Sequence, residues 1–316
     1  MEGPLVVTAG EPRVRRPVLG YVLVLAAAAL FGVNGSVAKV ALSSGLSSLR
    51  LSEARCAGAC IGLMLFALLR SPGSLRIRGR RDLLRLAIFG AGGVALVQLF
   101  YFLAIHRLAI GIALLIQYLG PLLVAIWART FGREHVRRRI WVGLAFSLSG
   151  LAVMVELWRG IALDGLGVTY ALIAAVIFAA YLLLAEREVA ERDPVSLMAW
   201  GFLFATLLWT VVQPWWSFPA HRVGRTVSLQ GHLASWHLPV WALVLWVVVL
   251  GSIVPFSLMV AGLGHVSATR VGIAAMLEPV VATIVAWAWL EESLSPVQLV
   301  GAAVVLAGVV LAQTAR

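Results

Sequence analysis

Charged residues are scarce in this chain of 316 residues. They make up 12% of it, whereas hydrophobic residues make up 61% and the mean hydropathy is +0.97. Soluble globular domains usually contain about 25% charged residues. So low a share excludes a cytosolic enzyme, a disordered protein and a nucleic-acid-binding protein, and it is typical of an integral membrane protein.

Cysteine and lysine are nearly absent. Cys56 and Cys60 lie four positions apart within an apolar run, so they form neither a disulfide framework nor a CxxC pair, and we interpret them as small buried thiols. Lys39 is the only lysine among 25 basic residues, and the formal net charge is +11. The arginines lie in short clusters between apolar runs, as in the loops that orient membrane proteins.

The motifs of enzymes and pumps are missing as well. The sequence contains no HExxH, no GxSxG and no P-loop, and no aspartate lies in a predicted membrane span. Without a nucleophile–base pair, paired carboxylates or a metal motif at membrane depth, an intramembrane enzyme and an ATP-driven pump are disfavoured. The histidines of the 213–240 loop (His221, His232 and His237) match no metal-ligand spacing, so we expect no metal and no cofactor.

Ten apolar runs are long enough to cross a bilayer, which takes about 20 residues of helix. They cover residues 18–42, 51–69, 84–105, 109–128, 140–157, 165–185, 196–213, 240–263, 268–290 and 296–313. The tryptophans of the 213–240 loop suit the membrane interface, where a short helix could lie on the membrane. The predicted fold is therefore all-α, with ten transmembrane helices after a cytoplasmic tail over 1–17.

The distribution of arginine predicts the orientation of these spans. One side of the membrane carries 18 basic residues, in the tail, in loops 70–85 and 129–139, and at Arg187, Arg192, Arg270 and Arg316. The other side carries 5, which are Arg50, Arg107, Arg159, Arg222 and Arg225. The positive-inside rule places both termini in the cytoplasm of a multi-pass protein of the cell (inner or plasma) membrane.

The two halves of the chain repeat each other. A shift of 158 positions aligns Pro121 with Pro279, Glu134 with Glu292, Gly143 with Gly301, and Gly150 with Gly308. The repeats cover residues 18–158 and 163–314, with five spans each. Because five is odd, the second repeat enters the membrane from the opposite face. Inverted repeats are common in secondary transporters, where the two halves enclose a central site.

The doubled pattern P-x12-E-x8-G-x6-G resembles the EamA domain of the drug/metabolite transporter superfamily. The resemblance covers about 18–155 and 165–313 of this chain. It implies a ten-helix carrier with a central cavity between two inverted halves, and it places Glu134, Glu291 and Glu292 at the family's loop acid, for capping or gating. Members of the superfamily include exporters of amino acids and related metabolites, so the resemblance sets the class of function and not the ligand.

Glu278 is the sharpest candidate for function. It lies near the middle of the ninth span, directly before Pro279. A carboxylate in hydrocarbon is costly, so it should face the bundle interior, pair with a cation or hold a proton. Pro279 also frees a backbone carbonyl one turn back. As a hypothesis, Glu278 binds a substrate ammonium or the coupling proton; the alternative is a structural hydrogen bond or salt bridge.

The equivalent place in the fourth span is chemically different. There Gly120 takes the position of Glu278, next to Gln117, Tyr118 and the helix-breaking Pro121. Broken helices at matching places in two halves point to a midplane binding site. Gln117 and Tyr118 would line this site, or Tyr118 is an interior packing residue.

Other polar residues lie in the remaining spans. Asn34 aligns with Tyr181 at an offset of 147, and both could line the cavity or join helices. Arg55 matches an arginine that the resemblance implies for the second helix; it would gate the outer mouth, pair with Glu278, or only anchor its helix. The other substrate-binding or coupling candidates are Gln98, Tyr101 and Trp200.

These features favour a secondary carrier that exports amino acids or related small metabolites by alternating access, coupled to protons through Glu278. Drug or amine efflux and translocation of lipid-linked sugars are the alternatives within the same superfamily. A non-transporting scaffold would leave Glu278 and the inverted repeat unexplained. The expected partners are the bilayer and a small molecule, without nucleic acid. The GxxxG of Gly58 and Gly62 allows close approach within one protomer or in a homodimer.

Overall fold

The computed structural model describes residues 16–133, 135–158 and 164–314. Almost all of the predicted tail, and Glu134, therefore lie outside the described residues. Within those ranges, nine helical segments are long and apolar enough to cross a membrane, and α7 (Arg138–Met154), with 17 residues, is a slightly shorter tenth. The all-α prediction is confirmed. Helices suit this setting because they satisfy the backbone polar groups internally.

The first half contains the first five spans. Its elements are α1 (Pro17–Leu42), α2 (Ser48–Arg70), the 3₁₀ turn η1 (Pro72–Leu75), α3 (Arg80–Ala87), the π-helical η2 (Ile88–Ala95), α4 (Leu96–Ile105), α5 (Ile110–Gln117), α6 (Gly120–Thr130) and α7. The third span runs from α3 to α4, and the fourth joins α5 to α6. Ser47 caps α2 by accepting a hydrogen bond from the Arg50 amide.

The second half repeats this order, with a longer segment between its second and third spans, on the side that the arginines predict to be outer. Its elements are α8 (Gly165–Glu191), α9 (Pro194–Val212), η3 (Trp215–Ser217), α10 (Ala220–Val223), β1 (Thr226–Ser228), η4 (Gly231–Leu233), β2 (His237–Pro239), α11 (Val240–Val248), the π-helical η5 (Val249–Ile253), α12 (Val254–Leu263), α13 (Ala268–Ala275), α14 (Leu277–Leu290) and α15 (Pro296–Gln313). Ser295 and Gln298 form a capping box that starts α15.

The interruptions of the spans match between the halves. A shift of 158 maps the π-helical η5 onto residues 91–95, inside the π-helical η2. The same shift maps Ala275, the last residue of α13, onto Gln117, the last residue of α5. π-helical turns often occur at functional sites, and broken helices in both halves often flank the binding site of a transporter. The region around the matched interruptions is therefore the candidate binding site.

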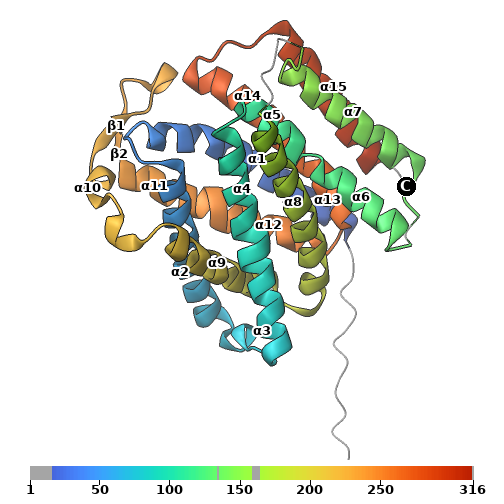
Figure 1. Ribbon diagram of the computed structural model, residues 1–316, viewed down its shortest axis with the longest axis horizontal. Coiled ribbons are helices and arrows are strands. Elements are labelled where there is room, and N and C mark those ends of the chain that lie inside the picture. Colours follow the sequence, from blue (N-terminus) through green and yellow to red (C-terminus); the bar gives the residue numbers. More distant parts are fainter. Residues whose placement is uncertain (1–15, 134, 159–163, 315–316) are drawn as a thin grey trace, which may run out of the picture.

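The fifth and tenth spans form a tight pair through their glycines. Figure 1 shows α7 and α15 side by side along one flank of the molecule. A Cβ at Gly143 would lie 2.7 Å from the carbonyl of Gly308, and one at Gly150 would lie 2.7 Å from the carbonyl of Gly301. Only glycine allows the backbones to approach this closely. The glycines that the repeat aligns are therefore the residues through which the two helices pack.

The GxxxG of α2 is used inside the chain. A Cβ at Gly58 would meet Val248 Cγ2 at 2.6 Å, and one at Gly62 would meet Ile253 Cδ1 at 2.6 Å. Both contacts lie on the eighth span, so the two glycines join α2 to the second half. Of the two interpretations of this motif, close packing within one protomer is the one observed.

The long segment between α9 and α11 is folded and contains a short helix and a β-hairpin. β1 and β2 pair antiparallel with Val227 opposite Leu238, and Figure 1 shows this hairpin beside α10 and α11. Trp289 Nε1 donates to the carbonyl of Leu229 over 3.0 Å, which ties the segment to α14. The expected interfacial helix is reduced to the four residues of α10, and the hairpin was not predicted.

Candidate functional site

The centre of the candidate site is the break in the ninth span. Glu278 lies in the first turn of α14 and is half-buried. The positive end of a helix dipole favours a carboxylate at this position. One turn earlier, the carbonyl of Ala275 has no helical donor, because Pro279 carries no N–H. The break therefore exposes a carboxylate and a free carbonyl at the same depth, as the sequence predicts.

Tyr118 joins the break in the fourth span to the break in the ninth. Its hydroxyl lies 3.0 Å from Glu278 Oε2, to which it donates, and 3.2 Å from the carbonyl oxygen of Ala275. Since a hydroxyl has one proton, the two acceptors share a single donor. The fully packed Tyr118 side chain thus has both a structural contact and a contact to the candidate carboxylate. The two matched interruptions meet at one point.

Gly120, the counterpart of Glu278, has no room for a side chain. A Cβ there would lie 2.7 Å from Phe178 Cδ1 and 3.2 Å from the carbonyl of Ala175. A Cβ at Gly272 would lie 3.0 Å from Pro121 Cβ, so α13 also packs closely on α6. The helix breaks are alike in backbone, but only the second carries a charge.

Arg55 provides a positive charge from α2. Its Nε donates to Ser252 Oγ over 3.1 Å, and its guanidinium carbon lies 5.9 Å from the centre of the Phe256 ring. Ser252 is fully buried in the π-helical η5 and donates in turn to the carbonyl of Val247. The charges of Arg55 and Glu278 interact, yet within the described ranges no nitrogen–oxygen contact of 4.0 Å or less joins them.

Glu53, the other acid of α2, belongs to a different contact. Its Oε2 accepts from Arg50 Nη1 over 2.7 Å, which forms a local salt bridge within α2. Arg50 also donates to the carbonyl of Pro214 over 3.1 Å and so holds the outer segment. Arg55 is thereby left without an acidic partner on its own helix.

A chain of aromatic contacts connects the two charged groups. Tyr118 contacts Phe178 edge-on at 6.4 Å between ring centres, Phe178 stacks with Tyr181 at 6.5 Å, and Tyr181 contacts Phe256 edge-on at 6.4 Å. Such pairs hold their rings in fixed geometry. Phe178 and Phe256 are not among the predicted site residues. The only signal for Phe178 is its alignment with Phe31 at the offset of 147.

Several polar atoms in the membrane spans are buried without a hydrogen-bond partner within the described residues. They are Asn34 Oδ1, both amide atoms of Gln98, Gln117 Oε1, the Tyr181 hydroxyl and Ser257 Oγ. A buried polar group without a partner costs about 1–3 kcal/mol, so each favours a polar ligand or a water molecule. Asn34 lies against Gly251, next to the Ser252 that holds Arg55.

The structure separates the remaining candidates. Tyr101, half-buried in α4, lies near enough for its hydroxyl to interact electrostatically with Glu278 and Tyr118, so it belongs with them. Trp200 instead donates from Nε1 to the carbonyl of Leu75 over 3.3 Å and stacks on Phe204. It lies at the short turn after α2, apart from the other candidates. In the described part of the chain, no three metal-ligating side chains gather.

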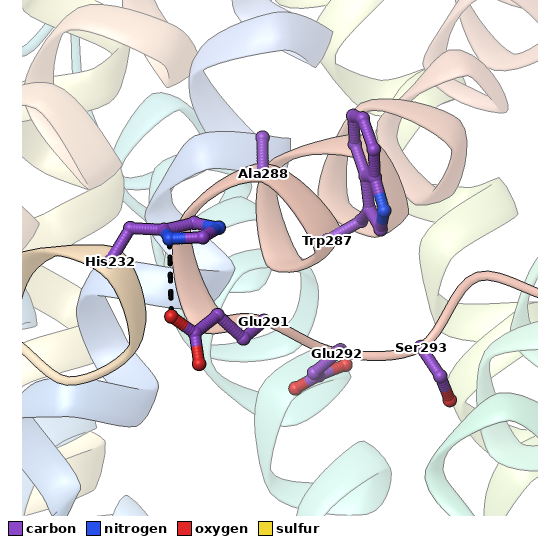
Figure 2. A pocket seen from close by; sticks show the side chains of 6 residues that line it. All are labelled: His232, Trp287, Ala288, Glu291, Glu292 and Ser293. Atoms are coloured by element: carbon purple, nitrogen blue, oxygen red, sulfur yellow. Dashed lines mark ion pairs between the residues drawn. The ribbon is translucent and has the colours of Figure 1, made fainter.

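Two of the loop acids, Glu291 and Glu292, lie on the side that the arginines predict to be outer. Figure 2 shows His232 facing Glu291, with Glu292 and Ser293 following on the loop after α14. These residues line a hollow of about 400 Å³. His232 Nδ1 lies 3.1 Å from Glu291, and Lys39 Nζ of the first half lies 2.5 Å from Glu292 Oε1. A second groove, of about 570 Å³, includes Glu292 and extends to Pro279.

The opposite ends of the spans are joined by a buried contact between the halves. Arg192 Nη2, from the end of α8, lies 2.7 Å from Asp82 Oδ2 of α3, and both side chains are largely buried. Arg192 also donates to the carbonyl of Ser74 over 3.2 Å, and Ser196 Oγ donates to the same carbonyl over 2.6 Å. The two halves are therefore linked by polar contacts at both ends of the bundle.

Known proteins resemble this chain in sequence and in fold. The EamA-like transporter family matches residues 18–156 and 165–314. The threonine/homoserine exporter RhtA of Escherichia coli (strain K12) is 28% identical over 294 residues, which cover 92% of this chain and 89% of that protein. An uncharacterized transporter of Archaeoglobus fulgidus is 29% identical over 245 residues, covering 76% and 80%. A protein crystal structure with 18% identity aligns over 94% of this chain and 97% of its own, with a TM-score of 0.74.

The family match includes both halves of the chain, and it confirms the resemblance recognised from the doubled proline–acid–glycine pattern. The solved structure supports the same fold over nearly the whole length. The apolar helices and the relatives together indicate a multi-pass membrane transporter and not an enzyme. This chain belongs to the EamA-like transporter family.

Proposed function

We propose that this protein is a secondary carrier that exports amino acids or related small metabolites by alternating access, with Glu278 binding the substrate ammonium or the coupling proton. The observation that carries the proposal is the pairing of the two helix breaks. Within the described residues, Glu278 accepts a hydrogen bond from Tyr118 through one oxygen only, and its side chain is half-buried. A carboxylate held in this way at membrane depth can exchange a proton or a cation.

The relatives support the choice of substrate. RhtA of Escherichia coli, a threonine/homoserine exporter, aligns with this chain over most of both lengths. Buried amide and hydroxyl atoms of Asn34, Gln117 and Tyr181 have no hydrogen-bond partner within the described residues, which favours a polar ligand over an apolar one. Efflux of a cationic amine is the second candidate, because a single carboxylate would also attract an amine that lacks a carboxylate of its own.

Alternating access has a physical basis in the contacts at the two ends. The Lys39–Glu292 pair is about half exposed, with side-chain exposures of 58% and 48%, so it opens at little cost. The Asp82–Arg192 pair is largely buried and has further hydrogen bonds, so it holds its end more firmly. With both termini in the cytoplasm, as the arginines predict, the weaker contact faces outward.

Reconstitution into proteoliposomes tests this function. The protein is given a labelled panel of small neutral amino acids, their amides and simple amines, with and without a pH gradient, and empty liposomes serve as the control. Saturable flux of an amino acid that responds to the gradient is the expected result. Flux of amines alone would favour the second candidate, and no flux of any compound would contradict the proposal.

A further inference from the structure

We infer that Arg55 binds the carboxylate of the substrate while Glu278 binds its ammonium, so that the site takes a zwitterionic α-amino acid between the two halves. This inference rests on the proposed function and deepens it. It assigns a second charged anchor on α2, on the other repeat from Glu278, and it makes a free carboxylate a requirement for the substrate.

The geometry of Arg55 fits a carboxylate. Its Nε is engaged by Ser252 Oγ, which fixes the plane of the guanidinium group. Its two terminal nitrogens make no hydrogen bond within the described residues, and the side chain is half-buried. A guanidinium group presents two parallel N–H donors to a carboxylate, which gives both strength and orientation. Arg55 is therefore held from one side and open on the other.

Glu278 is open in the complementary way. Tyr118 donates to Oε2, and within the described chain Oε1 accepts no hydrogen bond. The carboxylate thus keeps one oxygen for a cationic group. Since Tyr118 also lies against the Ala275 carbonyl, the orientation of the carboxylate is set by the backbone of the break.

The two charges interact but are not paired. A bare positive and a bare negative group in the interior of a membrane protein are costly unless each finds a partner. A direct ion pair would satisfy both, but none within 4.0 Å joins them in the described ranges. A zwitterion placed between them gives each charge a partner and adds no net charge. This is the ligand chemistry that the arrangement favours.

The groups near both anchors suit the same ligand. Asn34 Oδ1 is buried beside Gly251, next to the residue that holds Arg55, and Gln117 Oε1 is buried next to Tyr118. The Tyr181 hydroxyl lies on the aromatic chain between the anchors, on a side chain only 3% exposed. None of these atoms has a hydrogen-bond partner within the described residues. They remain available for a polar ligand or the water that accompanies it.

Competition binding on the purified full-length protein in nanodiscs tests the assignment. Labelled threonine is displaced by unlabelled threonine, by threonine amide, which lacks the carboxylate, and by the α-hydroxy acid that carries a hydroxyl in place of the ammonium. We expect each analogue to bind about 10- to 100-fold more weakly than threonine, the range for losing a charged hydrogen bond. This comparison uses the unmodified chain and does not depend on a variant that folds poorly.

Variants then assign each end of the ligand. In R55Q, threonine and threonine amide should bind equally, whereas R55K should keep part of the preference for threonine. E278Q should no longer prefer threonine to the α-hydroxy acid, which lacks the ammonium. It should still prefer threonine to threonine amide, which lacks the carboxylate. R70Q, at the far end of the same helix, is the matched control and should behave as the unmodified protein.

The outcomes separate this inference from the proposed function. If amino acids are bound and transported but R55Q still prefers threonine to its amide, Arg55 does not bind the carboxylate and the inference fails alone. If the unmodified chain transports amines or amides as well as amino acids, the requirement for a carboxylate is wrong. If it transports nothing in the panel, the proposed function fails, and this inference fails with it.

Discussion

The two broken spans of this protein have similar backbone breaks but different side chains at the equivalent position. In the first half the break places Gly120 against Phe178 and the carbonyl of Ala175, where no side chain fits. In the second half the equivalent position is Glu278, with an oxygen left open. Duplication has thus kept the geometry of the helix break in both halves, while only the second half carries a carboxylate there.

The π-helical turns show the same division. In η2 of the first half, glycines allow close packing, and a Cβ at Gly93 would lie 3.0 Å from Tyr181. In η5 of the second half, Ser252 reaches Arg55 instead. The first half contributes Arg55 and Tyr118 to the site, and the second half contributes their partners Ser252 and Glu278. A symmetric fold therefore forms an asymmetric candidate site.

Adding a carboxylate to the break of the first half is the most severe test of the difference between the two breaks. In G120E the new side chain has no space and no partner, so we expect a loss of about 3–5 kcal/mol in stability from overpacking and an unpaired buried charge. The melting temperature in detergent would measure this. G35A is the control, because a Cβ at Gly35 meets no atom within 4 Å. An unchanged melting temperature for G120E would show that the two breaks are not as different as their packing indicates.

Removing the bridge between the breaks should have the next largest effect. Y118F leaves Glu278 Oε2 and the Ala275 carbonyl without their donor, at a cost of about 1–3 kcal/mol. We expect a lower melting temperature and weaker binding of threonine. Y170F on α8 is the control, since the Tyr170 ring contacts Phe100 and its hydroxyl makes no hydrogen bond within the described residues. Equal effects of the two substitutions would contradict a special role for Tyr118.

Replacing each proline should distinguish the two breaks more finely. P279A restores an N–H that can bond to the Ala275 carbonyl, in competition with Tyr118, so the helix gains stability while transport slows. P121A should also gain stability, but with less effect on transport, because no carboxylate depends on that break. Melting temperatures and initial flux rates check both parts. A larger loss of transport in P121A than in P279A would reverse the comparison.

The outer ion pair should matter least. Lys39 and Glu292 are exposed, so K39Q should change stability by less than about 1 kcal/mol and alter flux only slightly. High salt should remove even this difference, because it screens exposed charges. Flux rates of K39Q at low and high salt measure the effect. A complete loss of transport in K39Q would mean that this contact, and not the central site, limits the cycle.

The sequence predicted most of the architecture because the lengths of the apolar runs, the placement of arginine and the repeat can be recognised without knowledge of tertiary contacts. It also predicted that Pro279 frees a carbonyl beside Glu278. It did not predict that Tyr118 reaches this carbonyl, because the two residues are 157 positions apart and a single sequence contains no signal for their contact. The π-helical turns and the roles of Phe178 and Phe256 were missed for the same reason, since each depends on packing between halves.

Trp200 illustrates the limit from the other direction. A tryptophan in an apolar span looks like a candidate for the interior, yet its indole nitrogen donates to the turn after α2. The span that contains Trp200 was predicted correctly. The position of Trp200 along that span, however, does not tell which neighbouring element its side chain contacts. Residue type and span number narrow the candidates, and only contacts between spans separate the site from its surroundings.

The central claim is that the carboxylate of Glu278 takes part in transport. Its most direct test is the initial rate of threonine flux in proteoliposomes, measured across a range of pH with and without a gradient, for the unmodified protein and E278Q. E291Q, on the exposed outer loop, is the matched control. We expect E278Q to lose about 100-fold in rate, the scale of a lost charged contact, and to lose its response to the gradient. A rate and pH profile of E278Q equal to those of the unmodified protein would contradict the claim.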